Sequence, residues 1–254
     1  MRVLALLCMD WPVVSAVAAH PALRGRAVAV VANNRVVACN AAARMAGVNR
    51  PLRRRDAQGR CPELALVDAD PERDARDFEP ILAAVESLRP GVASLWPGLL
   101  AVRSPARFYG GDEHAAAVLA QTVVDAGVWD VRTGIADDLT TAIHAAHLAE
   151  IQSSRIVPEG AAAEFWRGRG IAELLVSVRD ADFVELVEIV SVLNRLGLRR
   201  IGDFAALSTV DVVARFGARG ARPGPLPGLH RGAADDLMMD EADLHAASLR
   251  GFDA

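Results

Sequence analysis

The stretch ALLCMDWPVV, residues 5–14, combines a run of apolar residues with a single acid and a proline. The run predicts a buried strand over residues 2–9, and Asp10 with the proline after it predicts the N-cap and first turn of a helix over residues 11–19. A strand that delivers a carboxylate to the start of a helix is one way to hold a metal ion. Because Cys8 stands two residues before the acid, the stretch is either half of an active site or the remnant of one.

Beyond this stretch, hydrophobic periodicity predicts an α+β order of elements. RAVAVVANNRVVACN, residues 26–40, is typical of two strands joined at an Asn-Asn turn. A short alanine-rich helix ending at Gly47 follows, and then an irregular basic segment over residues 50–64. Further along we expect strands over 64–68, 92–96, 98–103 and 129–135, and helices over 71–89, 111–127 and 138–150. From about residue 160 onward helical segments dominate.

Composition excludes several classes of function. The 254 residues carry a formal net charge of −4, and all 28 basic residues are arginine, so a Schiff-base lysine and a phosphate-loop lysine are both excluded. Three widely spaced cysteines without a C-x-x-C pair indicate reduced thiols rather than a disulfide framework or a zinc site. Without a run long enough for a transmembrane helix or a convincing signal-peptide cleavage site, we expect a cytoplasmic protein.

Six segments occur in an order that is more specific than any one of them. They are LLCMDW, RGRAVAVVANNRVVACNAAARMAGV, CPELALV, GVASLWPGLLAV, TGIADDLTTAIHAA and LNRLGLRRIGDFAAL. The series, over about residues 1–220, resembles the Y-family (DinB/UmuC-like) translesion DNA polymerases. Within that family it is most similar to ImuB, the polymerase-like component of a bacterial mutasome.

The resemblance implies a fold and a set of domains. We expect an α+β polymerase-like palm, formed by residues 1–10 and 71–158, with a mixed or antiparallel sheet and helices on one face. A small fingers domain over residues 11–70 and a helical thumb with a helix-hairpin-helix over residues 159–220 should follow. Residues 221–254, which are proline-rich and then acidic, are expected to form a disordered tail, and the family's little finger is absent.

The resemblance also implies where catalytic metal ligands would stand. The family places one aspartate on the first palm strand and an adjacent Asp-Glu pair on a later hairpin, which together hold two magnesium ions. In this chain those positions carry Cys8, Trp96 and Pro97. A neutral thiol, an indole and a proline cannot replace hard anionic oxygen ligands. We therefore expect no catalytic residue, no metal and no cofactor, and a polymerase-like protein that is not an enzyme.

The nucleotide-handling positions of the family point the same way. The tyrosine that contacts the incoming triphosphate corresponds to Ala41, the phosphate-contacting lysine of the palm to Ile143, and the bulky residue that excludes ribonucleotides to Val13. Only an arginine of that set is retained, as Arg44.

Two basic segments are candidates for contact with DNA. Six arginines in a twenty-residue window oppose only Asp56, namely Arg44, Arg50, Arg53, Arg54, Arg55 and Arg60. This window is either a solvated basic loop or, since the resemblance places it in the fingers, a phosphate-binding surface. In the thumb, Arg199 and Arg200 follow the turn at residues 196–198, which is either a phosphate-binding hairpin or a plain helical hairpin. The predicted nucleic-acid-binding residues are Arg44, Arg53, Arg54, Arg55, Arg199 and Arg200.

By resemblance, the chain would act in DNA-damage tolerance and mutagenic translesion synthesis as a DNA-binding adaptor. Its expected partners are primer–template DNA, an error-prone DnaE-type polymerase, an ImuA-type protein and the sliding clamp. The regions expected to bind the protein partners lie beyond the thumb and are missing from this sequence. The chain would then be either a shortened adaptor or a fragment without function.

An alternative from another class is a metal-dependent nucleotidyltransferase or phosphohydrolase. It would use Asp10 with Asp137 or Asp138 as a displaced metal site. Other groups close to the acidic pair that can extend such a cluster are Asp112, Glu113 and His144. This alternative requires the carboxyl groups to converge within a few ångströms. The simpler interpretation is that acidic residues at the start of a helix interact favourably with the positive end of the helix dipole.

Overall fold

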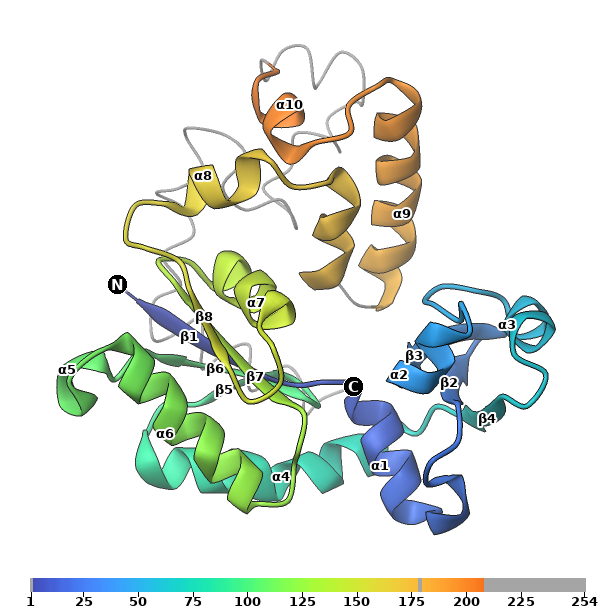
Figure 1. The fold of residues 1–254 in the computed structure, drawn as a ribbon, viewed down its shortest axis with the longest axis horizontal. Helices are drawn as coiled ribbons and strands as arrows, with labels where there is room; N and C mark the ends of the chain where they lie inside the picture. The colour runs from blue at the N-terminus through green and yellow to red at the C-terminus, as the bar shows by residue number, and fades with distance from the viewer. Residues whose placement is uncertain (1, 178–179, 208–254) are drawn as a thin grey trace.

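The computed structural model describes residues 2–177 and 180–207, and within them a five-stranded palm sheet is the largest element (Figure 1). Its strand order is β5 (Ala93–Trp96), β6 (Leu99–Arg103), β1 (Val3–Cys8), β7 (Val131–Ala136) and β8 (Ser154–Ile156). The central strand β1 is antiparallel to both β6 and β7, and β8 is parallel to β7. The mixed palm-type sheet predicted from the sequence is confirmed, with β8 as an addition that the sequence did not reveal.

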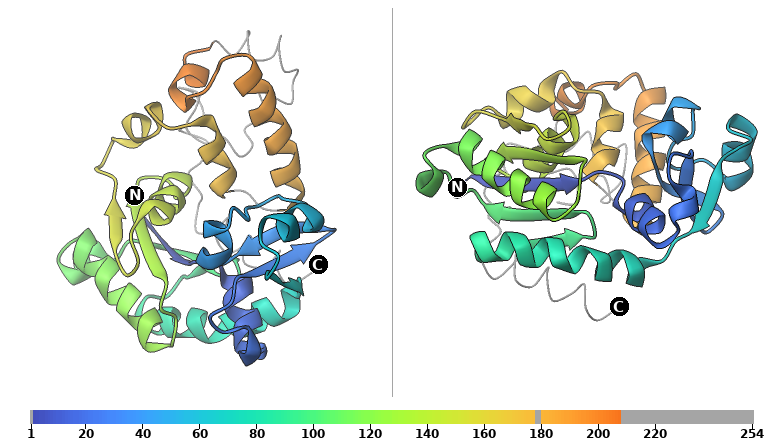
Figure 2. Two further views of the ribbon diagram at one scale, coloured as in Figure 1. Left: turned by 45° about the vertical axis from the view of Figure 1, so that its right-hand side comes forward. Right: turned by 60° about the horizontal axis from the view of Figure 1, so that its bottom comes forward.

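Helices pack on both faces of this sheet (Figure 2). Helices α4 (Pro71–Leu88) and α6 (Asp112–Asp125) form the expected layer on one face, against Leu4 and Leu6 of β1. Because side chains alternate along a strand, Leu7 points to the opposite face, where α7 (Leu139–Leu148) covers it. A short helix, α5 (Ala106–Tyr109), joins β6 to α6.

Gly134 on β7 explains why α7 lies so close to the sheet. A Cβ atom built at this glycine would lie 2.1 Å from the carbonyl oxygen of Ala142 and 2.3 Å from the amide nitrogen of Ala146. Both atoms belong to the α7 backbone and cannot move aside without moving the helix. The absence of a side chain at residue 134 therefore sets the distance between α7 and the palm sheet.

A second, three-stranded sheet forms the core of the fingers, in the order β3 (Arg35–Cys39), β2 (Val28–Ala32) and β4 (Ala65–Asp68). The predicted hairpin is confirmed, since Asn33 and Asn34 join β2 to β3 with positive φ angles of 48° and 60°. The flanking helices are α1 (Trp11–Ala19), the 3₁₀ helix η1 (Pro21–Leu23), α2 (Ala41–Met45) and α3 (Arg54–Arg60). Helix α3 occupies the basic segment for which the sequence predicted irregular structure.

The segment after β8 is helical, as predicted, and forms the thumb. It contains α8 (Ala162–Arg167), the 3₁₀ helix η2 (Ile171–Ser177), α9 (Asp180–Arg195) and α10 (Ile201–Ala205). Gly197, with φ of 83°, turns the chain between α9 and α10, so the predicted helical hairpin is present. The tail predicted over residues 221–254 lies outside the described residues, and the exact domain boundaries stay predictions.

The thumb is joined to the palm through His144, which is 1% exposed on α7. Its Nε2 lies 2.8 Å from Oε2 of Glu173 on η2, and its ring packs against Trp166 with centroids 4.6 Å apart. The indole N–H of Trp166 donates to the hydroxyl of Thr141 on α7 at 2.8 Å. Among the described helices, none is long and apolar enough to cross a membrane.

Replacing Gly134 with alanine should destabilise the protein strongly, because the added methyl group meets the α7 backbone. We expect a loss of about 3 kcal/mol in the free energy of unfolding, measured by urea denaturation, as for severe overpacking. The matched control is Gly59→Ala in α3, where a Cβ meets no atom within 4 Å. That variant should be neutral or more stable by up to about 1 kcal/mol. Equal effects of the two substitutions would contradict the role of Gly134.

The junction at His144 should make the fold sensitive to mild acid. Burial lowers the pKa of His144 below its ordinary value, with nearby Arg169 and Arg155 adding to the effect and Glu173 opposing it. The unfolded chain then binds a proton near pH 6.5 that the folded chain does not bind. The free energy of unfolding should therefore fall as pH drops below about 6.5, by at most about 1.4 kcal/mol per unit for one proton.

The measurement is urea unfolding at pH 7.5, 6.5 and 5.5 for the wild type and for His144→Gln, whose amide can still donate to Glu173. Burial acts to raise the pKa of Glu173, but hydrogen bonds from His144, the Gly170 N–H and Arg169 outweigh it and lower the pKa. The stability that the Glu173 carboxylate contributes is lost only when the pH falls below the ordinary range of carboxylate pKa values, which lies below the pH values of this measurement. If both proteins lose stability equally on acidification, His144 is not the group responsible.

Candidate functional site

The three positions that the resemblance assigns to the family's metal ligands lie side by side in the backbone. Cys8 ends β1, and its N–H donates to the carbonyl oxygen of Gly98 at 2.8 Å. Trp96 and Pro97 precede this glycine in the β5–β6 turn. Gly98 has φ of 96°, and a Cβ there would lie 2.4 Å from Cβ of Trp11. The turn is therefore packed tightly against the end of β1, which is the arrangement that a shared site requires.

The side chain of Cys8 is unsuited to bind a metal ion. It is 1% exposed and belongs to the apolar cluster that includes Trp11 and Phe78. Burial raises the pKa of the Cys8 thiol to about 12, and the negative charge of Asp130 contributes. The thiol therefore stays neutral at physiological pH, whereas the thiolate is the form that binds metals.

Trp96 enters a different apolar cluster, on the face of the palm sheet covered by α7. That cluster includes Ile143, the residue at the family's lysine position, together with Met9 and Leu139. Two positions that carry charges in the resembled family are thus occupied by apolar residues that share one cluster. Cys8 and Trp96 belong to clusters on opposite faces, so their side chains do not converge on a common point.

The prediction that Asp10 caps helix α1 is wrong for its side chain. The backbone of Asp10 is left-handed, with φ of 55°, whereas a capping side chain needs an extended backbone to reach the first N–H groups. Its carbonyl oxygen instead accepts from the N–H of Val13 at 2.8 Å and of Val14 at 3.1 Å. The predicted helix over residues 11–19 and its early proline are confirmed.

The carboxylate of Asp10 pairs with Arg44 on α2. Nη1 of Arg44 lies 2.7 Å from Oδ1 of Asp10 and also donates to the carbonyl oxygen of Cys39. Burial raises the pKa of Asp10 above its ordinary value, although the hydrogen bond and charge of Arg44 oppose this. Arg44, which the sequence suggested as a nucleic-acid ligand, is therefore half-buried and engaged by an internal carboxylate.

The other predicted nucleic-acid-binding residues are exposed, but they form two separate groups. Arg53, Arg54 and Arg55 lie at the start of α3 in the fingers, where Arg54 faces Asp68 at 3.6 Å. Arg53 and Arg55 have no ionic or hydrogen-bonding side-chain partner among residues 2–177 and 180–207. Arg199 and Arg200 lie between α9 and α10 in the thumb, away from α3 (Figure 1).

The structure contradicts the displaced metal site. Asp10 follows the C-terminal end of β1, whereas Asp137 follows β7, which pairs its last residue Ala136 with Val3 at the N-terminal end of β1. Six strand residues separate these ends by about 17 Å. Asp10 therefore cannot share a metal ion with either Asp137 or Asp138.

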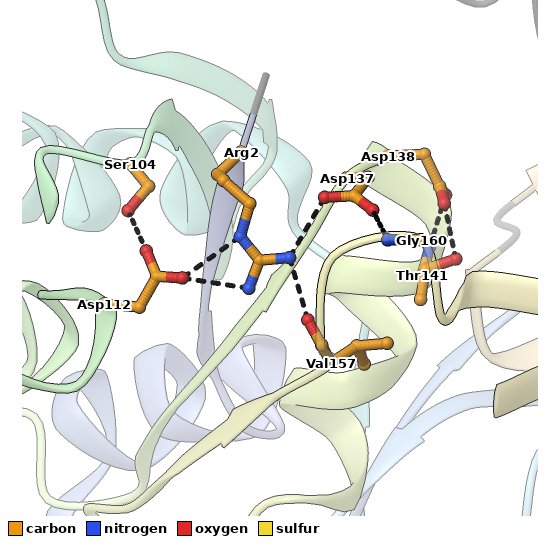
Figure 3. A network of polar contacts seen from close by, with 8 residues as sticks. All are labelled: Arg2, Ser104, Asp112, Asp137, Asp138, Thr141, Val157 and Gly160. Carbon is orange, nitrogen blue, oxygen red and sulfur yellow. Dashed lines mark hydrogen bonds and ion pairs between the residues drawn. The ribbon is translucent and has the colours of Figure 1, made fainter.

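Asp112, Asp137 and Asp138 each have a structural partner instead (Figure 3). The guanidinium of Arg2 lies between two carboxylates, 2.9 Å from Asp112 and 3.0 Å from Asp137, and it also donates to the carbonyl oxygen of Val157. Asp138 caps α7 by accepting from the N–H of Thr141 at 2.8 Å. The dipole interpretation of this acid is the correct one.

Among the charge contacts that were not identified from the sequence, two lie beside the residues discussed above. One is the Arg2 network, which had no local signal because its partners are more than a hundred residues away. The other is Asp130 with Arg132, whose guanidinium contacts both carboxylate oxygens at 2.7 and 3.0 Å. The carbonyl of Asp130 accepts from the N–H of Met9 at 2.9 Å, so this pair borders the former ligand positions. In the part of the chain that the structure describes, no group of three or more His, Cys, Asp or Glu residues could hold a metal ion.

The sequence and the fold are similar to those of known proteins. A family model described as IMS, the impB/mucB/samB family, matches residues 9–147. Among curated proteins, none matches the sequence.

Solved structures share the fold at low sequence identity. DinB from Sulfolobus solfataricus superposes with a TM-score of 0.70 at 15% identity, over 93% of this chain and 67% of that one. A Dbh ternary complex gives a TM-score of 0.67 at 16% identity, with the same coverage of both chains. An insertion ternary complex of Dbh DNA polymerase gives 0.66 at 15% identity, over 87% of this chain and 65% of that one.

The matched residues begin directly after β1 and include the fingers sheet, the β5–β6 turn and most of α7, which are elements of the site described above. The family model covers more than half of the sequence, and the palm and fingers have the architecture of the solved relatives. The chain belongs to the impB/mucB/samB family, within the superfamily of Y-family DNA polymerases.

Proposed function

We propose that the chain is a catalytically inactive, ImuB-like member of its family that acts as a DNA-binding adaptor in DNA-damage tolerance and mutagenic translesion synthesis. One observation carries the loss of catalysis. By the resemblance, the positions of the three metal-binding carboxylates hold Cys8, Trp96 and Pro97 and that of the phosphate-contacting lysine holds Ile143, and the structure places Ile143 in one apolar cluster with Trp96.

The energetics of this replacement support a stable, non-catalytic palm. Removing a single member of a buried ionic set leaves an uncompensated charge, which is costly. Replacing the whole set by apolar residues that pack together is often neutral or stabilising. Asp10, the acid two residues after Cys8, is paired with Arg44 at 2.7 Å. Magnesium takes several oxygen ligands, and one oxygen of this carboxylate is already engaged by an arginine.

The exposed arginines of α3 support the DNA-binding part of the proposal. Arg53, Arg54 and Arg55 are consecutive and solvent-exposed, and only Arg54 has an acidic partner among the described residues, at 3.6 Å. Such cations gain free energy by releasing condensed counterions from nucleic acid. Arg199 and Arg200 offer a second contact point on the thumb.

The protein partners are proposed from the resemblance alone. They are an error-prone DnaE-type polymerase, an ImuA-type protein and the sliding clamp, with the cytoplasm as the expected location. The chain spans 67% of the length of Sulfolobus solfataricus DinB, so contacts made through the remaining third of such a protein cannot be assigned to these residues.

Primer extension tests the loss of catalysis. The protein should incorporate no nucleotide on undamaged or damaged primer–template DNA, with magnesium or with manganese, because Cys8, Trp96 and Pro97 cannot supply the anionic oxygen ligands of the resembled family. Sulfolobus solfataricus DinB assayed in parallel establishes that the substrates are competent. Metal-dependent incorporation above the no-enzyme control would refute the proposal.

DNA binding should depend on salt and on the three consecutive arginines of α3. We expect the triple variant Arg53→Glu, Arg54→Glu and Arg55→Glu to reduce the slope of log K against log salt by about 2 to 3, if each arginine neutralises one phosphate. Fluorescence anisotropy of labelled primer–template DNA measures this slope between 50 and 200 mM salt.

The matched control makes the same charge change on the palm, where Arg76, Arg103 and Arg107 are exposed. Replacing these three by glutamate should leave the slope near that of the wild type. A wild type that does not bind at the lowest salt concentration would argue that the chain has no DNA-binding function. Equal effects of both triple variants would indicate a response to net charge rather than a surface on α3.

A further inference from the structure

The fingers and thumb are two arms that are anchored separately to the palm. Helix α1, at the base of the fingers, is fixed to α4, since the indole N–H of Trp11 donates to the carbonyl oxygen of Asp74 at 2.8 Å and the Ser15 hydroxyl bonds Asp77 at 2.6 Å. The thumb is fixed to α7 through the His144–Glu173 and Trp166–Thr141 contacts described above. Each arm therefore has its own polar anchor on a palm helix.

One contact bridges the two arms directly. Cζ of Arg50, in the loop before α3, lies 3.6 Å from the centre of the Phe183 ring on α9. Both Figure 1 and Figure 2 show α9 running down beside the fingers, with its first turns closest to them. Among the described elements, no helix or strand of the fingers packs extensively against a helix of the thumb. The cation–π contact therefore lies where the described helices and strands of the two arms do not pack extensively together.

The two partners in this contact differ in exposure. Phe183 is 5% exposed and belongs to the thumb core with Leu186 and Leu193, so its ring is fixed. Arg50 is partly exposed and carries its guanidinium on a long side chain. It stands three residues before the exposed Arg53. A guanidinium prefers the charged, bidentate hydrogen bonds of a phosphate to the face of a phenyl ring. A nucleic acid held by Arg53 would bring phosphates within reach of Arg50.

We propose that Arg50 and Phe183 form a latch between fingers and thumb, which closes the molecule in the absence of nucleic acid and opens when a phosphate captures Arg50. The latch itself rests on the Arg50–Phe183 contact and on the lack of extensive packing between the described helices and strands of the fingers and thumb. Its release by nucleic acid rests on the DNA binding proposed above. The molecule that opens the latch should be a polyanion, because the group that must leave the Phe183 ring is the cationic guanidinium of Arg50.

The latch is tested without DNA by measuring the distance between the arms. Spin labels on cysteines introduced at the exposed residues Gln58 of α3 and Glu188 of α9 report this distance by double electron–electron resonance. The wild-type background should give a narrow distribution. Phe183→Leu, which removes the ring but keeps an apolar side chain, should broaden it toward longer distances.

Two further variants separate the latch from damage to the thumb. Arg50→Gln leaves the thumb core intact and should broaden the distribution as Phe183→Leu does. Phe204→Leu makes the same chemical change in the same thumb cluster, on α10 away from the fingers, and should leave the distribution narrow. An unchanged distribution in Arg50→Gln, or equal broadening in Phe204→Leu, would overturn the latch.

The release step is tested with primer–template DNA. Saturating DNA should broaden or lengthen the wild-type distribution, and Phe183→Leu should bind DNA about two- to fivefold more tightly because it no longer loses the cation–π contact. DNA that binds while the arms keep the narrow distribution would overturn release. Absence of DNA binding at low salt would overturn the proposed function and release together, while the distance measurements still decide whether the latch exists.

Discussion

Strand β1 is hydrogen-bonded to β6 on one side and to β7 on the other, and the rest of the molecule takes its position from those two ladders. Its alternating side chains supply both apolar faces of the palm, which bind α4 and α6 below and α7 above. Its N-terminal end carries Arg2, which gathers the carboxylates of Asp112 and Asp137. Its C-terminal end leads through Cys8 to Asp10 and into the fingers. A single strand thus connects the Arg2 network, Cys8 and the fingers.

The sequence predicted most of these elements because their signals are local. The apolar run before Asp10, the Asn-Asn turn and the helical spacing of Phe78, Ile81 and Val85 each lie within a few residues, and the structure contains the corresponding strand, hairpin and helix. Strand β8 was missed because three residues carry too little pattern to distinguish a strand from a loop. Helix α3 was missed because its exposed arginines lack an apolar stripe, and only Ala57 within it is buried.

The candidate site was less predictable, since its contacts join residues that are distant in sequence. The resemblance indicates which residues stand at the ligand positions. It does not predict that Cys8 and Trp96 belong to apolar clusters on opposite faces of the palm sheet. Asp10 has a local signal for a helix cap, namely the proline two residues later, and that signal gives the helix start correctly. It gives the wrong partner for the side chain, because a charged hydrogen bond to Arg44 on another element is stronger than a bond to a backbone N–H.

The pair formed by Asp10 and Arg44 gives this acid a role that does not depend on a metal ion. Arg44 is the arginine retained from the nucleotide-handling set, and its guanidinium is half-buried between α2 and the end of β1. A buried guanidinium without an anion is costly, and a polymerase of this fold would offer it a triphosphate. In this chain Asp10 supplies the anion permanently. The fingers are thereby attached to the palm by an internal charge pair between α2 and the end of β1.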